Sequence, residues 1–327
     1  MTHLDRRQLF TLAGAAGLAA TAAMPGSTPA LAKATAAGTQ GPGVYRYKVG
    51  DIEVTAINDG VWTFPLKEGF VVNAKLPDVQ AALKDAFLPP ETLSIPFTVL
   101  VVNTGSKLVL IDTGTGALLA PTAGNLTANL AAAGIDPKAI DTILISHFHP
   151  DHINGVRPKD GLATFPNAEI KVPEGEMSFW MDDAKMAAAP EGLKGGFENV
   201  RRVFAPIAKS VKIFLPDEEL ETGITAIGAP GHTPGHSCFA IHSGNAKLLT
   251  LSDTTNHPAL FVRNPDWAAV FDMDADMARA TRHKLLDMAA SERMQVAGYH
   301  FPFPATGFIA RDGAKYQLVP VAWTPVL

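Results

Sequence analysis

Ser146-His147-Phe148-His149-Pro150-Asp151-His152 is the stretch of this sequence that decides the fold. Three imidazoles and one carboxylate lie within six residues, directly after the apolar run at residues 143–145. Such a run is short enough for a buried strand, and the proline and aspartate that follow predict that it ends in a loop. Histidine and aspartate are rarely buried without a partner, whereas one divalent cation satisfies several of them at once. The stretch therefore predicts a metal site at the mouth of a strand.

Metal-binding residue types recur just past predicted strand ends in three further places. These are His232, Asp253 and His300, each of which comes shortly after a short apolar run. A metal ion takes about four protein ligands, and two ions about 3.5–4 Å apart need a shared anion between them. The distribution therefore predicts a binuclear centre, assembled from four loops on one rim of a sheet sandwich.

Predicted strands and helices alternate along the rest of the chain. Residues 45–57 predict a hairpin, residues 58–60 a second turn, and residues 62–70 an irregular region. Residues 190–196 are rich in glycine and predict a loop. Helices are predicted at residues 77–88, 122–133, 174–186, 197–204 and 274–290, the last with Asp274 as its N-cap. The alternation predicts one α/β domain with helices covering the sheets.

The metal motif resembles that of the metallo-β-lactamase superfamily, over roughly residues 45–323. The resemblance implies an αββα sandwich, in which two facing β-sheets carry helices outside and the site at one edge. It also divides seven ligands between two metals: His147, His149 and His232 for one, Asp151, His152 and His300 for the other, with Asp253 bridging them.

Two smaller signatures of that superfamily occur in the expected order, Asp112-Thr113-Gly114 and residues 231–236. Asp112 follows a predicted strand and precedes glycines, so we expect it to hold loop backbone by hydrogen bonds rather than bind metal. His236 is expected to support His232 in the same indirect way. Zinc is the first expectation for the metal, with manganese, iron or cobalt as alternatives, because histidine and aspartate suit all four.

The ligand set also predicts the kind of chemistry. Two metals lower the pKa of bound water from about 15.7 to near 7, which predicts a bridging hydroxide as the nucleophile. Asp151 and Asp253 are expected to orient it and accept its proton. β-Lactam hydrolysis is disfavoured, since β-lactamases lack a bridging carboxylate such as Asp253.

Within the superfamily the sequence is most similar to methyl parathion hydrolase and its relatives that hydrolyse aryl esters and lactones. Residues 102–110, 165–168 and 301–304 and the pair Phe179-Trp180 carry this likeness. It implies hydrolysis of a small lactone, acyl-homoserine lactones included, or of an aryl ester. Alternatives are a phosphotriester, a hydroxyacylglutathione-type thioester, or metal binding without turnover. The candidates for an apolar substrate pocket are Trp180, Phe197, Phe70 and His257.

Composition and charge exclude some partners. Hydrophobic residues make up 47% of the chain and charged residues 18%, as in an ordinary globular protein. The net charge is -5 and no dense run of lysine and arginine occurs, which argues against nucleic-acid binding. The single cysteine, Cys238, excludes an intramolecular disulfide and is expected to be a small buried apolar residue.

The beginning of the chain has the pattern of an export signal. Arg6-Arg7 precede an uncharged stretch rich in alanine and glycine, and Ala30-Leu31-Ala32 offers a small-x-small cleavage site. We therefore predict a twin-arginine signal peptide at residues 1–32, a flexible lead-in at 33–43 and the hydrolase domain at 44–327. The expected location is the periplasm or outside the cell, without stable membrane insertion after cleavage. A homodimer that pairs through residues 62–70 is a further expectation.

Overall fold

The protein is described here from a computed structural model, over residues 37–159 and 161–327. The predicted signal peptide at residues 1–32 lies outside these described residues, so it stays a prediction. Residues 41–327 form one compact unit. Among the described residues, no helix has the length and apolar character needed to cross a membrane.

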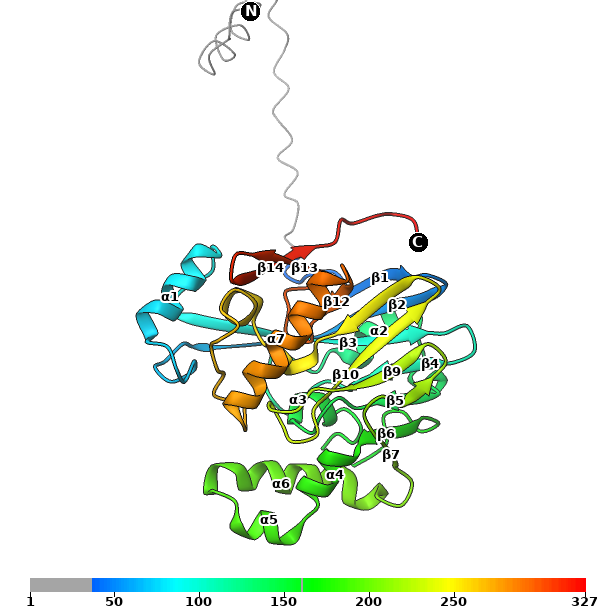
Figure 1. Cartoon of the computed structure of the whole chain (residues 1–327). Helices are drawn as coiled ribbons and strands as arrows, with labels where there is room; N and C mark the ends of the chain where they lie inside the picture. Colours follow the sequence, from blue (N-terminus) through cyan, green and yellow to red (C-terminus); the bar gives the residue numbers. More distant parts are fainter. Residues whose placement is uncertain (1–36, 160) are drawn as a thin grey trace, which may run out of the picture. The chain divides into compact units, whose positions relative to one another are not determined.

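Two seven-stranded sheets form the framework of the unit (Figure 1). The first sheet has its strands in chain order: β1 (Val44–Val49), β2 (Ile52–Pro65), β3 (Thr92–Asn103), β4 (Leu108–Ile111), β5 (Thr142–Leu144), β6 (Glu169–Pro173) and β7 (Lys212–Phe214). The second sheet consists, from one edge to the other, of β14 (Lys315–Pro320), β13 (Thr306–Asp312), β12 (Gln295–Ala297), β11 (Ala246–Thr250), β10 (Ser237–Ser243), β9 (Ile224–Gly228) and β8 (Glu219–Glu221).

Seven α-helices connect or cover these strands, and α7 crosses the second sheet in Figure 1. They are α1 (Leu76–Asp85), α2 (Leu126–Ala132), α3 (Pro150–Ile153), α4 (Glu174–Trp180), α5 (Asp183–Ala188), α6 (Glu191–Phe204) and α7 (Ala275–Ser291). Asp274 caps α7 as predicted, because its side chain accepts a hydrogen bond from the Met277 nitrogen.

The two sheets and the helices outside them form a sandwich of four layers. Apolar side chains fill the three spaces between these layers. Val54 and Val102 of the first sheet meet Phe239 and Leu248 of the second in the central space. A larger apolar cluster packs the other face of the first sheet against α1, α2 and α6, and a third packs the second sheet against α7. The αββα sandwich predicted from the sequence is therefore confirmed.

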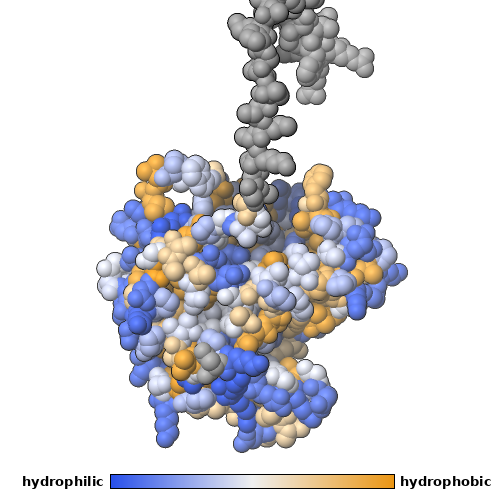
Figure 2. Space-filling view, turned by 180° about the vertical axis from the view of Figure 1, so that it is seen from behind, coloured by the Kyte–Doolittle hydropathy of each residue, from blue (hydrophilic) through white to orange (hydrophobic). Residues whose placement is uncertain are grey.

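The face seen in Figure 2 carries hydrophilic residues with small, scattered apolar patches.

The structure corrects the prediction of a turn at residues 58–60. Strand β2 continues through it with a β-bulge between Asn58 and Gly60. The bulge turns the buried Asp59 inward, where its carboxylate accepts hydrogen bonds from the backbone nitrogens of Thr115 and Leu126. A Cβ on Gly60 would lie 2.2 Å from the Thr122 oxygen, so only glycine fits this close approach.

Two further predictions of local structure were wrong. The glycine-rich residues 190–196 are not a loop, because all but the first belong to α6. Burial of Phe197, Val200 and Phe204 on one face of that helix outweighs the low helix propensity of its glycines. The helix predicted at 174–186 is two short helices, α4 and α5.

The aromatic side chains of residues 62–70 pack against one another. Trp62 and Phe64 have ring centroids 4.4 Å apart, and Phe64 and Phe70 have theirs 5.8 Å apart. Phe70 is buried. Pairing of two copies through this region stays a prediction.

Candidate metal centre

In the first sheet, four of the predicted ligands follow β5. His147 and His149 lie in the loop directly after this strand, and α3 carries Asp151 and His152. Pro150 begins α3, since proline is favoured at a first helical position and sets the chain direction there. The four ligands at residues 147–152 therefore occupy one loop and one short helix. Their side chains lie together at the carboxyl end of β5.

In the second sheet, the remaining three ligands follow three strands that end at the same side of the sandwich. Strands β9, β11 and β12 run in one direction, because β10 pairs antiparallel with its two neighbours and β12 pairs parallel with β11. His232, Asp253 and His300 follow the carboxyl ends of these three strands. Residues more than 80 positions apart in the chain thus meet at one place.

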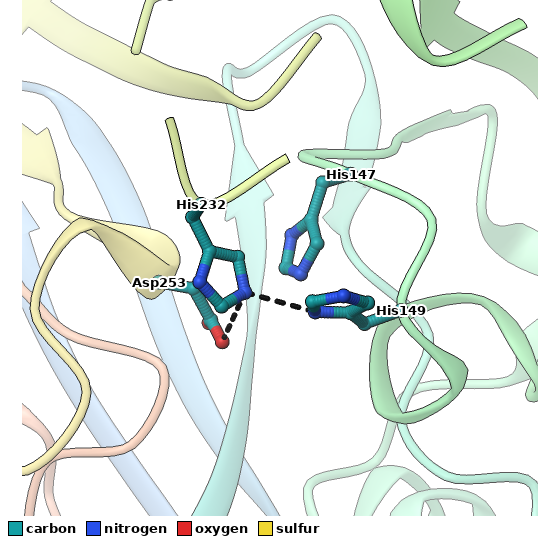
Figure 3. A group of neighbouring side chains, drawn as sticks. All are labelled: His147, His149, His232 and Asp253. Carbon is teal, nitrogen blue, oxygen red and sulfur yellow. Dashed lines mark hydrogen bonds and ion pairs between the residues drawn. The ribbon is translucent and has the colours of Figure 1, made fainter. Parts of the chain in front are cut away.

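The first group of ligand atoms belongs to His147, His149, His232 and Asp253, all within 4.8 Å of one another. Figure 3 shows the three rings and the carboxylate pointing toward a common centre. His149 Nδ1 lies 2.8 Å from His232 Nε2, and His232 Nε2 lies 3.3 Å from Asp253 Oδ2. Four ligand atoms this close together could hold one metal ion.

The second group consists of Asp151, His152 and His300, whose ligand atoms also lie within 4.8 Å of one another. Asp151 Oδ2 lies 3.5 Å from both His152 Nε2 and His300 Nε2. Asp253 touches this group as well, since its Oδ1 lies 3.1 Å from His152 Nε2 and its Oδ2 lies 3.0 Å from His300 Nε2. One carboxylate therefore lies between the two groups, at the position where the family resemblance implies a bridging ligand.

Atoms without partners show that the residues fit two cations. Nε2 of His147 is buried and has no hydrogen-bond partner among the described residues, while Nε2 of His152 and Oδ1 of Asp253 make no hydrogen bond there and lie 3.1 Å from each other. A buried polar atom without a partner costs about 1–3 kcal/mol, so atoms left in this state in one cluster indicate that it binds cations. Imidazole nitrogen and carboxylate oxygen are donors that suit zinc and its first-row neighbours.

The electrostatics of the cluster also favour cations. Burial lowers the pKa of His149 to about 3 and that of His147 well below its usual value, so both rings are neutral and able to bind metal. Burial acts the same way on His232, but hydrogen bonds and charges of Asp253 and Asp272 outweigh it and raise the pKa of His232 to about 9. Nearby carboxylates likewise raise the pKa of His152 against its burial.

Asp112 lies where the sequence placed it, as a hydrogen-bond partner of the metal motif. Its Oδ2 lies 2.8 Å from His152 Nδ1, and its Oδ1 accepts a hydrogen bond of 2.8 Å from the Ser146 nitrogen. Its φ is +60°, a left-handed conformation that costs a non-glycine residue about 1–3 kcal/mol. The hydrogen bonds hold it there, and its carboxylate leaves His152 Nε2 free to face the cluster.

Asp272 is a functional residue that the sequence reasoning missed. Its Oδ1 lies 2.9 Å from His232 Nδ1, so it orients His232 as Asp112 orients His152. No motif marks Asp272, which lies in an irregular segment before α7. The segment reaches His232 because the Met273 and Asp274 nitrogens donate hydrogen bonds to the His232 and Gly231 oxygens.

His236 contacts two of the predicted ligands. Its Nε2 accepts a hydrogen bond of 3.1 Å from the Asp253 backbone nitrogen, and its Nδ1 lies 3.0 Å from the Ala229 oxygen. Its ring also packs against that of the predicted partner His232, at 5.6 Å between centroids, so its hydrogen bond positions Asp253 in addition. Burial lowers the pKa of His236 to about 3, which keeps the ring neutral and lets Nε2 act as an acceptor.

Glu176 of α4 is a second residue that the sequence reasoning missed. Its buried carboxylate accepts hydrogen bonds from the backbone nitrogens of Phe148 (2.8 Å) and Gly235 (2.7 Å) and from Trp180 Nε1 (2.9 Å). Phe148 and Gly235 belong to the two loops that carry the ligands His147, His149 and His232. Glu176 thus ties both loops to one helix.

A cavity of about 160 Å³ opens beside the two ligand groups. Apolar side chains form one wall, and ligands of both groups form the other. Its lining residues are Trp62, Ile95, Phe97, Leu119, His149, Pro150, Asp151, Asp253, Asn256, Phe271 and His300.

The residues predicted for a substrate pocket do not line this cavity. Trp180 and Phe197 pack together in the core with ring centroids 4.9 Å apart, and Trp180 Nε1 donates a hydrogen bond to Glu176 there. Phe70 lies behind the lining residue Phe271, at 5.8 Å between ring centroids. His257 is buried, and burial together with the charge of His300 lowers its pKa to about 4.

Cys238 is buried, as expected of a small apolar residue. Its thiol donates a hydrogen bond to the Leu251 oxygen, and burial raises its pKa to about 12. It is therefore a thiol rather than a thiolate at neutral pH.

Solved structures share this architecture. The chain is similar to AidC, a dizinc quorum-quenching lactonase determined with the product N-hexanoyl-L-homoserine. The identity is 30% and the TM-score 0.82, over 86% of this chain and 99% of AidC. It is also similar to AbOPH, a hydrolase in the beta lactamase superfamily, with 29% identity and a TM-score of 0.81 over 88% of this chain and 100% of AbOPH.

Curated relatives match a shorter part of the chain. The probable metallo-hydrolase Mb2322c of Mycobacterium bovis (strain ATCC BAA-935 / AF2122/97) is 26% identical over 49% of this chain and 56% of its own length. The N-acyl homoserine lactonase AttM of Agrobacterium fabrum (strain C58 / ATCC 33970) is 27% identical over 38% of this chain and 44% of its own. This chain thus spans about half the length of these relatives. The model of the metallo-beta-lactamase superfamily matches residues 92–294, which shows that the chain belongs to that superfamily.

Proposed function

We propose that this metallo-hydrolase cleaves the ester bond of small lactones, N-acyl homoserine lactones included, or of aryl esters. The observation that carries the proposal is the cavity, where ligands of both groups meet an apolar wall. An ester with an apolar substituent fits such a wall, because the apolar part loses contact with water while the ester carbonyl faces the ligands. The similarity to AidC and AttM, which are named as lactonases, supports the lactone assignment.

The seven ligand residues would hold two divalent ions, with Asp253 between them. Ions bound there supply Lewis-acid polarisation of a carbonyl oxygen and a nucleophile at neutral pH. The chain contributes Asp151, whose side chain is 15% exposed and lines the cavity. Burial raises the pKa of Asp151, but His152 and His300 outweigh this and lower it, so the carboxylate is ionised at neutral pH.

The two carboxylates therefore have different tasks. Asp253 is held among three histidines and its side chain is only 4% exposed, so its task is to position the two groups relative to each other. Both carboxylates line the cavity, but Asp151 is the more exposed of the two, and it is placed to accept a proton there. In the ring opening of a lactone it would return this proton to the leaving alkoxide, whereas the aryloxide of an aryl ester can leave without it.

A substrate panel tests the proposal with the purified protein loaded with zinc or manganese. N-hexanoyl homoserine lactone and dihydrocoumarin probe lactones, p-nitrophenyl hexanoate an aryl ester, paraoxon a phosphotriester, and S-lactoylglutathione a thioester. Turnover of a lactone or the aryl ester is expected. Turnover of paraoxon or the thioester alone would move the assignment to that class. Two bound metals without turnover of any substrate would show a binding protein.

We also propose that the protein is exported through the twin-arginine pathway. The sequence support is Arg6-Arg7, the uncharged stretch after them and the Ala30-Leu31-Ala32 site. Fractionation of cells that express the full chain, followed by mass spectrometry of the N-terminus, checks this. A periplasmic protein that begins near Lys33 is expected, whereas a full-length cytoplasmic protein contradicts it.

A further inference from the structure

Arg282 of α7 carries a positive charge in the interior of the protein. It is 1% exposed and ranks among the largest fully buried side chains. Burying an isolated guanidinium is very costly, so its partners explain why it is tolerated. The Nε atom donates to the Thr254 oxygen at 2.7 Å, and Nη1 donates to the oxygens of Pro265 (3.0 Å) and Trp267. Nη2 donates to Asp272 Oδ2 at 3.3 Å.

One of these partners contacts a predicted metal ligand, and two others lie close in the chain to a ligand or to the cavity lining. Asp272 orients the ligand His232 through its other oxygen, Oδ1. Thr254 directly follows the bridging ligand Asp253, and Trp267 precedes the cavity residue Phe271 by a few residues. A single guanidinium therefore joins the segment after Asp253 to the segment that leads to Phe271 and Asp272.

The geometry of Asp272 depends on this guanidinium. Its Oδ2 accepts from Arg282 and, at 3.1 Å, from the Ala269 nitrogen, which leaves Oδ1 directed at His232. Both charged side chains are about 1% exposed, so water cannot replace a lost partner. Removing the guanidinium would leave the buried Asp272 carboxylate with only one backbone donor and His232. Such a change is strongly destabilising, because it leaves a buried charge without its partner.

We propose that Arg282 is a positioning residue of the metal centre, which fixes His232 through Asp272 and joins the metal-ligand segment at Asp253 to the cavity wall. The alternative is a charge pair that only stabilises the fold. The two readings differ in one respect. A fold-stabilising pair leaves the metal sites of the folded protein unchanged, whereas a positioning pair changes the metal sites even in a fully folded variant.

The test measures metal directly, in the full-length protein. Arg282→Met keeps much of the side-chain volume and removes the charge, and Arg282→Lys keeps the charge without the planar set of guanidinium donors. Arg279→Met is the control from the same helix, because it removes a half-buried charge that, among the described residues, pairs only with the exposed Asp276. Zinc per chain after dialysis against a chelator and the visible spectrum of the cobalt-substituted protein are compared. Far-ultraviolet circular dichroism selects folded samples.

Arg282→Met is expected to lose about 10- to 100-fold in affinity for one of two ions and to change the cobalt spectrum. Arg282→Lys should recover part of the affinity, and Arg279→Met should behave as the wild type. Folded Arg282→Met with two tightly held ions and an unchanged spectrum would overturn the proposal.

If Arg282→Met does not fold, Asp272→Asn tests the same proposal by removing the charge that pairs with Arg282. Its amide oxygen can still accept from His232 Nδ1, but it no longer pairs with a charge. The proposal expects weaker binding of one ion, and wild-type binding would overturn it. These measurements need no substrate, so they stand even if the wild type hydrolyses no ester and the proposed function fails.

Discussion

Asp112 and Asp272 perform the same task in the two halves of the metal centre. Each is a buried carboxylate whose oxygen lies within 2.9 Å of the Nδ1 atom of one ligand, His152 for Asp112 and His232 for Asp272. Fixing Nδ1 leaves Nε2 of each ring directed at a metal position. The two halves differ in how the carboxylate is held.

Asp112 is held by its neighbours in the sheet. Strand β4 pairs in parallel with β5, with Ile111 opposite Leu144, so the next residues of both strands lie side by side. Asp112 consequently accepts from the Ser146 backbone nitrogen, one residue before His147. Asp272 is held by a side chain from another layer, Arg282 of α7. One half of the centre is thus built from adjacent strands, and the other half depends on how a helix docks.

Asp253→Ala is the change expected to have the largest effect, because Asp253 belongs to both halves. Removing it leaves three histidines without the carboxylate between them. We expect a loss of kcat/KM on the order of a thousandfold or more and weaker binding of both ions. Activity assays and zinc per chain check this, with the exposed Asp266→Ala as control. Two retained metals and normal rates would show that Asp253 does not bridge.

Asp112→Ala is expected to damage mainly one half, because Asp112 contacts His152 directly and reaches His147 of the other half only through Ser146. It removes the acceptor for His152 Nδ1, so we expect about a 10- to 100-fold loss of affinity for the ion held by Asp151, His152 and His300. Asp272→Ala should do the same to the ion held by His147, His149 and His232. Cobalt spectra of the two variants should therefore differ from each other. Identical spectra would contradict the division of ligands between the halves.

Phe271→Ala tests the apolar side of the cavity. Phe271 directly precedes Asp272 in the chain, whereas neither neighbour of Asp112 in the chain lines the cavity. Loss of its apolar surface should raise KM about 10-fold for N-hexanoyl homoserine lactone and less for γ-butyrolactone. The number of bound metals should not change. Phe197→Ala is the matched control, since Phe197 lies in the core and its loss should lower stability without this difference between substrates. Equal KM changes for the two lactones would remove Phe271 from the substrate site.

Trp180→Phe should affect both halves slightly and equally. It deletes one of the donors to Glu176, which holds a loop of each sheet. We expect a loss of about 1 kcal/mol in the free energy of unfolding, measured with urea, and an unchanged KM. An increase in KM like that of Phe271→Ala would return Trp180 to the substrate pocket.

Glu221→Gln should leave the metal centre unaffected, because Glu221 lies at the opposite ends of the strands. Its carboxylate accepts from Lys107 Nζ (3.0 Å), Lys171 Nζ (2.9 Å) and Thr142 Oγ1 (2.8 Å). Burial raises the pKa of Glu221, but these hydrogen bonds outweigh it and lower the pKa.

A lowered folded-state pKa means that ionised Glu221 stabilises the fold. This contribution is present above the unfolded pKa of about 4.3 and is lost as the pH falls through the lowered value. Glu221→Gln should therefore cost about 1–3 kcal/mol at pH 7 and progressively less below about pH 4. Urea unfolding at several pH values measures the difference. A cost that does not change with pH would show that the charge is unimportant.

Much of the metal centre could be predicted from the sequence, because its residues follow strands closely. His147 to His152 form one dense motif, and Asp112 lies at the end of the neighbouring strand. The fold class followed from the same strands and from the family resemblance. Errors arose where burial decided local structure, as at α6, whose glycines alone predict a loop, and at the bulge that carries Asp59.

The sequence by itself determined which residue types stand at the strand ends, and those types determine that metal can bind. Only the tertiary structure decided what holds and surrounds the ligands. Asp272 serves His232 from 40 residues away, Glu176 joins two loops, and Phe271 rather than Trp180 faces the cavity. The physical reason is range. A ligand that follows a strand is encoded by its immediate neighbours, whereas the partner of a buried polar atom depends on which distant segment packs against it.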